Sequence, residues 1–257
     1  MTLNTYLINR PAFDVDTFLV FLKNGGTSWA RSDNATPPEE LVEIAGRICY
    51  LSFGLNQSNT TNSEFVKRLI ESRHETVLEH VSWTFLITGI SRALTHQLVR
   101  HRVGFSFSQL SQEYHDEIDN EPIEPPIIKE NPEIRKVWQN AVRTSNNAYR
   151  QILHYLRESN TLNDPSKGEK GQKQTARSIA RSVLTNATET KILVTANARA
   201  WRHFFEVRGS VPNNEEMRHL AAQLLDHLQK EAPSLFFDFS TELLSDGSPV
   251  ITHTTNT

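Results

Sequence analysis

Two segments of the chain have the hydrophobic pattern of β-strands. Residues 81–88, VSWTFLIT, alternate apolar with polar side chains, and this period of two is typical of a half-buried strand. Gly89 is expected to end that strand. Residues 191–197, KILVTAN, form a short apolar run that predicts a second strand. The chain is therefore expected to contain a β-sheet.

Helical periodicity and capping residues predict that much of the remaining chain is helical. Thr36, followed by two prolines and two glutamates, is a strong helix start, and Thr61 with Glu64 resembles a capping box. Ser91 is expected to cap a helix whose end carries RHR at 100–102. Further helices are expected from Asp14 or Asp16 to Gly25, over 131–156, near 173–184, from about Arg199, and from Pro212 to about Lys230.

The mixture of helices with one or two clear strands predicts an α+β fold rather than regular βαβ winding. We expect mixed helices packed on a mainly antiparallel sheet, in a single domain over residues 1–257. Surface insertions are expected near 116–131 and 160–172, the second around a polar loop at 163–172. Residues 249–257 are expected to form a short polar tail.

Composition and charge argue against several classes of protein. The net charge of −3 does not suit a general nucleic-acid binder, because such domains carry a broad basic face. No apolar run reaches the roughly 20 residues of a membrane span, and residues 1–13 lack the features of a signal peptide. The single cysteine, Cys49, cannot form an internal disulfide, which agrees with a reducing compartment. We therefore expect a cytoplasmic protein with no membrane or nucleic-acid partner.

Arginine is the main candidate for binding anions. The chain has no glycine-rich phosphate loop, and its 18 arginines outnumber its 9 lysines, which favours planar guanidinium groups for recognising phosphate or carboxylate. Each of three arginine clusters could be either a site or a solvated face. The clusters are Arg100 with Arg102, Arg177 with Arg181, and Arg199 with Arg202 and Arg208.

The histidines of HETVLEH, residues 74–80, do not predict a metal site. His74 and His80 are six residues apart, whereas a metalloprotease helix needs two histidines at positions i and i+4. Both side chains could instead satisfy polar contacts at a helix-to-strand turn. We therefore expect no metal ion here.

The order and spacing of several motifs resemble the flavin-dependent thymidylate synthases. The motifs are HETVLEH at 74–80, RHR at 100–102, the serine-rich segment ending in SQEY at 111–114, and NARAWRHFFEVR at 197–208. AGRICY at 45–50 is similar to the family's early helix, so the resemblance runs from about residue 45 to 209. It implies reductive methylation of dUMP to dTMP, with FAD as cofactor, NADPH as reductant and methylenetetrahydrofolate as carbon donor. It also implies a homotetramer in which several subunits build each pocket.

The resemblance also implies which residues form the site. Arg208 matches the catalytic arginine, which would stabilise negative charge at N3 and O4 of the uracil ring. The implied FAD contacts are His74, Thr76, Glu79, Arg100, His101, Arg102, Gln109, Asn197, Arg199 and His203. The implied dUMP contacts are Gln97, Leu98, Val99, Arg100, Gln109, Leu110, Ser111, Gln112, Glu113, Arg181 and Arg208.

The segment after RHR departs from the family pattern. One additional residue precedes Ser111, and we expect the chain to bulge near Gly104. Glu113 stands where an arginine is usual, and a carboxylate facing a phosphate repels it unless the carboxylate turns away or is paired. Phosphate binding could therefore depend more on Arg181, or Glu113 could pair with a neighbouring arginine.

Two other functions stay open at this point. One is a flavin-binding paralogue with lost or altered nucleotide specificity, and the other is a non-enzymatic nucleic-acid binder that uses the arginine clusters. Cys49 has no adjacent base in the sequence, so we expect it to pack in a helix rather than attack substrate. Ser111 is expected to bind substrate. Trp83 and Phe85 could cover the flavin, but we expect them in the core.

Overall fold

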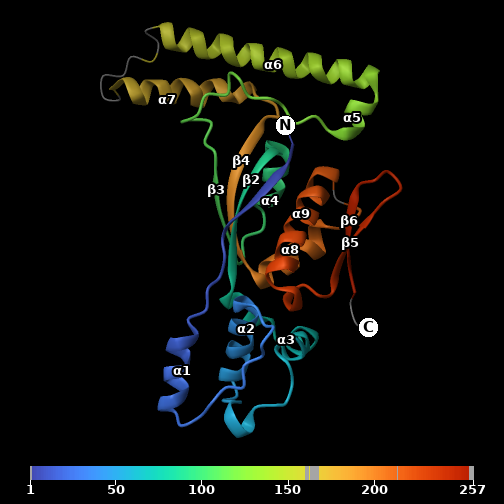
Figure 1. The fold of residues 1–257 in the computed structure, drawn as a ribbon. Helices are drawn as coiled ribbons and strands as arrows, with labels where there is room; N and C mark the ends of the chain where they lie inside the picture. Colours follow the sequence, from blue (N-terminus) through green and yellow to red (C-terminus); the bar gives the residue numbers. More distant parts are fainter. Residues whose placement is uncertain (1, 160–161, 163–167, 213, 255–257) are drawn as a thin grey trace. The chain divides into compact units, whose positions relative to one another are not determined.

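The computed structural model describes residues 2–159, 162, 168–212 and 214–254 (Figure 1). The chain divides into two compact units, and each is described by itself. Unit 1 consists of Met1–Asn4, Ile87–Arg100 and Phe107–Leu193, and unit 2 consists of Thr5–Leu86, His101–Ser106 and Val194–Thr257. No helix in the described part of the chain is both long enough and apolar enough to cross a membrane.

A four-stranded sheet has the order β1-β2-β4-β3. Its strands are β1 (Asn4–Asn9), β2 (Ser82–Ser91), β3 (Phe105–Gln109) and β4 (Glu189–Asn197). The backbone N–H of Arg92 donates to Thr188 near one end of the β2–β4 pair, and that of Ala198 donates to Val81 near the other, so these strands are antiparallel. At the two ends of the β3–β4 pair, the backbone N–H of Leu110 donates to the carbonyl oxygen of Lys191 and that of Asn197 donates to Gly104. Strands β3 and β4 are therefore also antiparallel. The predicted α+β class with an antiparallel sheet is confirmed.

Gly89 does not end strand β2, contrary to the sequence prediction. The strand continues to Ser91, and Gly89 has φ +68°, a left-handed conformation that favours glycine. A Cβ atom at this position would lie 2.2 Å from the carbonyl oxygen of Thr2. Glycine is therefore needed at position 89 because the backbone of Thr2 approaches closely. It interrupts the alternation of apolar and polar residues without ending the strand.

Unit 2 contains most of the helices. They are α1 (Val15–Asn24), α2 (Pro37–Ile48), α3 (Asn62–Glu71), α8 (Ala198–Arg208) and α9 (Glu215–Glu231), with short 3₁₀ helices η1 (Gly54–Asn56), η2 (Glu75–His80) and η5 (Pro233–Leu235). Predicted caps form: the Asp14 side chain accepts from Thr17 N, and Thr61 and Glu64 form a reciprocal capping box. Local sequence thus explains where these helices begin.

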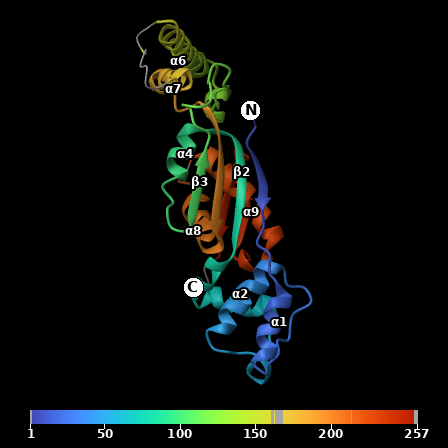
Figure 2. The same ribbon diagram turned by 90° about the vertical axis from the view of Figure 1, so that its left-hand side faces the viewer.

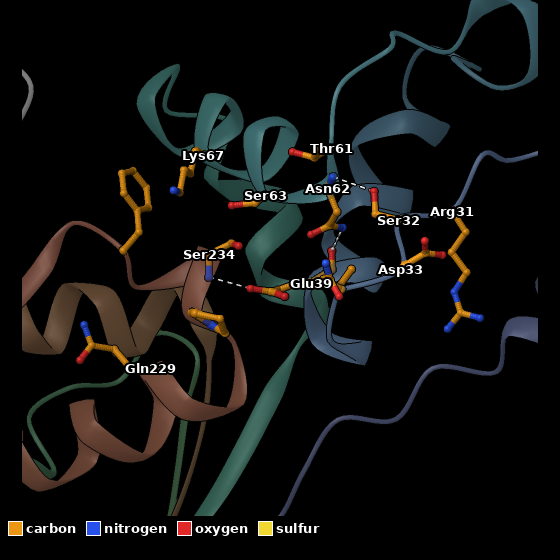
Figure 3. A pocket seen from close by; sticks show the side chains of 14 residues that line it. Arg31, Ser32, Asp33, Glu39, Thr61, Asn62, Ser63, Lys67, Gln229 and Ser234 are labelled. Atoms are coloured by element: carbon orange, nitrogen blue, oxygen red, sulfur yellow. Dashed lines mark hydrogen bonds between the residues drawn. The ribbon is translucent and has the colours of Figure 1, made fainter.

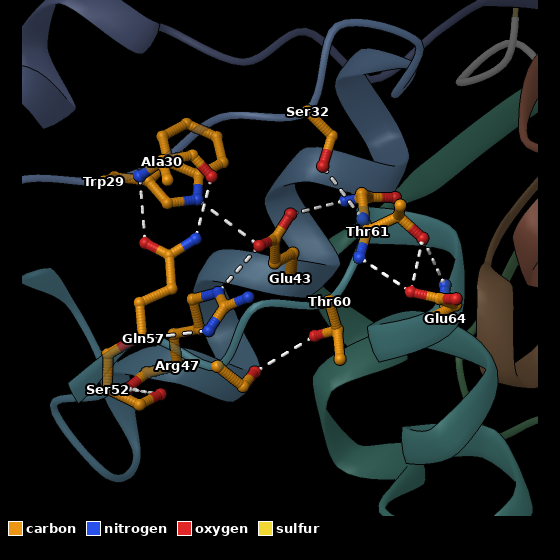
Figure 4. Close-up of polar contacts among 12 residues, drawn as sticks. Trp29, Ala30, Ser32, Glu43, Arg47, Ser52, Gln57, Thr60, Thr61 and Glu64 are labelled. Carbon is orange, nitrogen blue, oxygen red and sulfur yellow. Dashed lines mark hydrogen bonds and ion pairs between the residues drawn. The ribbon is translucent and has the colours of Figure 1, made fainter. Parts of the chain in front are cut away.

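A buried polar network joins α2 to the start of α3 (Figure 4). Glu43 Oε1 accepts hydrogen bonds from Arg47 Nε at 2.7 Å and Trp29 Nε1 at 3.3 Å, while Oε2 accepts from Asn62 Nδ2 at 2.7 Å. Glu43 and Arg47 are 1% and 0% exposed, so each charge depends on the other. The predicted early helix around 45–50 is therefore anchored by polar contacts as well as apolar ones.

Aromatic side chains fill much of the core of unit 2. Trp83 and Phe85 on β2 are fully buried, and the Phe85 ring meets Trp201 of α8 edge-on at 5.6 Å between centroids. The core role expected for Trp83 and Phe85 is confirmed. Burial of these rings fixes the face that α8 turns toward the strand.

The C-terminal segment pairs as a strand instead of forming the predicted tail. Strand β6 (Pro249–His253) pairs antiparallel with β5 (Phe239–Leu243), and Val250 and Ile251 are buried. Helices α8 and α9 contact this hairpin (Figure 1). The prediction was wrong because the short run PVI gives a weak periodic signal, and only its partner strand and the helices bury it.

Unit 1 contains α4 (Arg92–Leu98), α5 (Pro126–Glu130), α6 (Pro132–Glu158), α7 (Gly168–Ala180) and η4 (Arg181–Val183). Helices α6 and α7 lie side by side in both views (Figures 1 and 2) and share a core that includes Tyr149, Leu153 and Ala176. Ser91 caps α4 as predicted, and Asn131, where the long helix was expected to begin, caps α6. Helix α7 begins earlier than predicted, since Gly168–Gln172 are helical rather than loop; residues 163–167 lie outside the described residues. Whether 116–131 and 160–172 are insertions stays a prediction.

Cys49 is exposed, so the packing role predicted for it is wrong. It follows the last residue of α2, and its thiol donates to the carbonyl oxygen of Ala45 at 3.3 Å. Helix α2 ends at Ile48, so Cys49 lies beyond the helical residues that are buried. The apolar pattern around it did not reveal this change of environment.

Candidate active site

In unit 2, the structure brings Arg208 and His101 into contact. Arg208 is the last residue of α8, and His101 follows the end of α4 in the sequence. Arg208 Nε donates a hydrogen bond to His101 Nε2 at 3.0 Å. The predicted catalytic arginine is therefore held by a residue that the sequence assigned to cofactor binding.

His101 is kept neutral by its surroundings. Its ring packs against Phe105 and Phe204, with centroids 5.6 and 5.4 Å away. Burial, with smaller contributions from the positive charge of Arg208 and from the nearby His203, lowers the pKa of His101 to about 4. A neutral imidazole can accept the Arg208 hydrogen bond at Nε2, which an imidazolium could not do. The pair thus keeps one positive charge, and that charge is on Arg208.

A tight turn precedes strand β3 where the sequence predicted a bulge. Gly104 has φ +73°, and a Cβ there would lie 2.8 Å from Asn197 Nδ2 and from Ala200 Cβ. Asn197 is the N-cap of α8, and its Oδ1 accepts from Ala200 N at 2.9 Å. Asn197, predicted to contact FAD, therefore also fixes the start of the helix that carries Arg208.

Arg199 is engaged by two carboxylates of the 3₁₀ helix η2. Its Nη1 lies 2.6 Å from Glu79 Oε1, and its Nε lies 3.2 Å from Glu75 Oε2. Arg199 and Glu79, both predicted FAD contacts, are thus brought together. The sequence analysis missed Glu75, although its place in the same HETVLEH motif was an available signal.

Arg202 does not belong to an anion site, although the sequence grouped it with Arg199 and Arg208. It is 5% exposed and forms a bidentate pair with Asp238, at 2.7 and 2.5 Å. Its guanidinium also lies over the Phe239 ring, 4.9 Å from the centroid. Arg202 is a structural residue, and Asp238 is too distant in sequence for the pairing to have been predicted.

The remaining unit 2 residues of the predicted site are exposed. His74, Thr76 and Arg102 are at the surface, and His203 is exposed with its ring 6.2 Å from that of His101. No hydrogen bond or ion pair with another described residue engages the guanidinium of Arg102. An exposed guanidinium without a protein partner is suited to a pyrophosphate such as that of FAD. The residues present in unit 2 thus fit the expected cofactor.

In unit 1, several predicted substrate residues adjoin the end of β3. Gln109 Nε2 donates to Thr95 Oγ1 at 2.9 Å, and Ser111 Oγ accepts from Glu113 N at 3.3 Å. Leu110 N donates to Lys191 O at 2.9 Å, which extends the pairing with β4. The Leu98 side chain is fully buried, so the predicted contact of Leu98 with dUMP would have to be made by its backbone. Gln97, Val99 and Gln112 are half-buried, and Arg100 is exposed.

Glu113 pairs with Arg181, one of the two possibilities that the sequence left open. Arg181 Nη2 lies 2.8 Å from Glu113 Oε1, and Ser178 Oγ donates to the same oxygen at 3.2 Å. Gln174 Nε2 donates to Glu113 Oε2 at 3.3 Å. Sequence reasoning missed Gln174 and Ser178, although the spacing 174, 178, 181 places all three donors on one helix face.

A separate cavity of about 820 Å³ in unit 2 contains none of the predicted site residues (Figure 3). Ser32, Asp33, Asn62, Ser63 and Lys67 are among the side chains that line it. Glu39 at its edge accepts a hydrogen bond from the backbone N–H of Ser234 at 2.6 Å. This cavity is therefore distinct from the Arg208–His101 pair.

Comparisons with known proteins agree with the motifs and the fold. The family described as "Thymidylate synthase complementing protein" matches residues 33–234. A flavin-dependent thymidylate synthase of Mycobacteroides abscessus is 44% identical over 231 residues, which is 90% of each chain. One from Corynebacterium diphtheriae is 41% identical over 233 residues, covering 90% of this chain and 91% of its own.

A solved structure supports the fold independently of close sequence identity. The UMP/dUMP methylase PolB from Streptomyces cacaoi, bound with 5-Br dUMP, superposes with a TM-score of 0.61 at 18% identity. The match covers 92% of this chain and 94% of that one. The matched family and the sequence relatives together define a thymidylate synthase class of enzyme. Within that class, the chain belongs to the flavin-dependent thymidylate synthases.

Proposed function

We propose that the chain methylates dUMP reductively to dTMP, with FAD as cofactor, NADPH as reductant and methylenetetrahydrofolate as carbon donor. The observation that carries this proposal is the match to flavin-dependent thymidylate synthases at 44% identity over 90% of the chain. Such coverage includes each motif on which the resemblance rests. The reaction needs no protein nucleophile, in keeping with a single cysteine that has no neighbouring base.

Arg208 is proposed to act on the pyrimidine. Its guanidinium would stabilise negative charge at N3 and O4, so that C5 becomes the nucleophilic carbon. The hydrogen bond to neutral His101 supports this role, because it orients the guanidinium without neutralising its charge. When bound, FAD supplies the hydride-transfer chemistry.

The cofactor and nucleotide contacts follow the two groups of residues described above. In unit 2, FAD is proposed to contact His74, Thr76, Glu79, His101, Arg102, Asn197, Arg199 and His203. In unit 1, Arg100 and Gln109 would contact both ligands, and dUMP would contact Gln97 to Val99, Leu110 to Glu113, and Arg181. Exposed Arg100 and Arg102 suit anionic ligands, because charge-assisted hydrogen bonds to phosphate are strong.

We also propose that the active form is a homotetramer in which several subunits contribute to each pocket. Such sharing would allow residues on different parts of one chain to serve different pockets. The cytoplasmic location expected from the sequence stays a prediction.

The decisive experiment is anaerobic mixing of the NADPH-reduced protein with dUMP and methylenetetrahydrofolate. Flavin absorbance and dTMP, the latter by chromatography, are followed in the same reaction. We expect flavin reoxidation to accompany dTMP formation, and omission of dUMP to prevent both. A protein that binds and reduces FAD but forms no dTMP would instead be a paralogue with altered specificity.

A further inference from the structure

We propose that the Glu113 carboxylate is an internal competitor of the dUMP phosphate, which must displace it from Arg181, Ser178 and Gln174 in order to bind. The proposal rests on the proposed function, since it takes dUMP as the nucleotide. It assigns to Glu113 a specificity-determining role: this residue sets how strongly the 5′-phosphate contributes to nucleotide affinity.

The geometry around Glu113 is that of a small anion site. Three donors, Gln174 and Ser178 on α7 and Arg181 at the start of η4, converge on the two oxygens of one carboxylate. Their distances of 3.3, 3.2 and 2.8 Å are within hydrogen-bonding range. A phosphate offers the same kind of charged oxygen acceptors as a carboxylate, so the donors can serve either group.

Arg92, which senses the charge of Arg181, and Arg177, one turn before Arg181, add further guanidinium groups near Glu113. Arg92 Nε and Arg177 Nε are both buried with no hydrogen-bond partner among the described residues. Burial lowers the pKa of Arg92, and the positive charge of Arg181 acts in the same direction. The nearest carboxylate to Arg92 is that of Glu117, 3.9 Å away, and burial raises the pKa of Glu117. A further anion on this face would therefore be stabilised.

The Glu113 pair is poised to open rather than locked in place. The side chains of Arg181 and Glu113 are 39% and 30% exposed, so water can replace either partner when the pair separates. This contrasts with the Arg202–Asp238 pair, whose members are 7% and 8% exposed. A half-exposed pair of this kind contributes little net stability, and displacement of Glu113 by a doubly charged phosphate is feasible.

The test compares wild-type protein with Glu113→Gln in FAD-loaded form. Dissociation constants for dUMP and for deoxyuridine, which lacks the phosphate, are measured by calorimetry or by perturbation of the flavin spectrum. Glutamine keeps the size of the side chain but loses its charge. We expect dUMP to bind at least about fivefold more tightly to the variant, as for loss of a competing exposed ion pair, with deoxyuridine unchanged.

A matched control and a second variant separate this effect from changes in folding. Glu124 forms a comparable pair with Arg135 at 2.8 Å in the same unit, so Glu124→Gln should leave both dissociation constants unchanged. Arg181→Gln should weaken dUMP binding. Adding Glu113→Gln to the Arg181→Gln variant should increase dUMP affinity by a smaller factor than Glu113→Gln does in the wild type. Thermal unfolding of each variant identifies any that has lost its fold.

The outcomes distinguish the inference from the proposed function. The inference is overturned if Glu113→Gln binds dUMP no more tightly than wild type, or if its affinity for deoxyuridine increases by the same factor. In either case, dTMP formation by the wild type still upholds the proposed function. Weaker dUMP binding would mean that Glu113 orients Arg181 for the phosphate. A wild-type protein that neither binds dUMP nor forms dTMP overturns both.

Discussion

At the scale of single residues, chemical identity sets what a side chain can do, and its surroundings set which of these roles it takes. Arg208 and Arg202 are both arginines on α8, yet one meets a neutral histidine and the other a buried carboxylate. The first can act on a ligand, whereas the second is committed to the fold. Two tests address the residues of the Arg208–His101 pair.

Replacing Arg208 tests its proposed action on the pyrimidine. Arg208→Ala should reduce dTMP formation by at least about 100-fold, as for loss of a group that stabilises developing charge. FAD should stay bound, because the remaining proposed contacts are intact, and flavin absorbance after gel filtration measures this. Near-normal dTMP formation would remove Arg208 from the catalytic role.

The neutral state of His101 predicts how stability depends on pH. Its pKa falls from 6.5 to about 4 on folding, so between these values the unfolded chain binds more protons than the folded one. The contribution of His101 to stability is complete above pH 6.5 and is lost as the pH falls toward 4. The free energy of unfolding, measured in urea from pH 7 to 5, should fall less steeply for His101→Asn than for wild type. Parallel slopes would contradict the assignment.

At the scale of elements, turns and caps place the functional side chains. Helix α8 follows strand β4 directly, and Asn197 ends the strand and caps the helix, so Arg199 and Arg208 lie at opposite ends of one rigid element. Gly104 allows the segment before β3 to approach that cap. The turn and the cap therefore depend on each other.

Gly104→Ala tests this dependence, with Gly247→Ala as its matched control. Both glycines have positive φ, +73° and +80°, so alanine should cost about 1–2 kcal/mol of conformational free energy at either site. A Cβ at Gly104 would clash with Ala200 and Asn197, whereas a Cβ at Gly247 would meet no atom within 4 Å apart from its chain neighbours. Urea unfolding should show the larger loss for Gly104→Ala, together with weaker FAD binding by fluorescence titration. Equal losses and unchanged FAD affinity would show that the contact with Asn197 is unimportant.

At the scale of the whole molecule, we expect the proposed site to depend on assembly. Large apolar side chains are exposed on the described surface, among them Tyr50, Leu51 and Leu55, at 73%, 67% and 107%. Exposed apolar surface of this kind is typical of protein interfaces. The tetramer proposed from the family would cover part of such a surface.

Sedimentation equilibrium tests the assembly directly. The FAD-loaded protein should have the mass of four 29.3 kDa chains, and its activity per chain should fall on dilution as the tetramer dissociates. A monomer that retains full activity would show that one chain builds a complete pocket.

The sequence by itself determined the family, the α+β class and most helix starts. The caps at Thr61 with Glu64 and at Ser91 could be predicted because a cap is made by residues only two or three positions apart. Motif order was readable for a similar reason, since it requires no knowledge of distant contacts. A helix cap depends only on residues within about one helical turn of each other.

Only the tertiary structure decided what depends on residues far apart in the chain. It paired Glu113 with Arg181, buried Arg202 against Asp238, turned residues 249–253 into a strand, exposed Cys49 and kept His101 neutral. Each outcome is set by desolvation and by partners that fold topology brings together. Electrostatic and burial free energies act through space, so the linear order of residues does not specify them until the chain has folded.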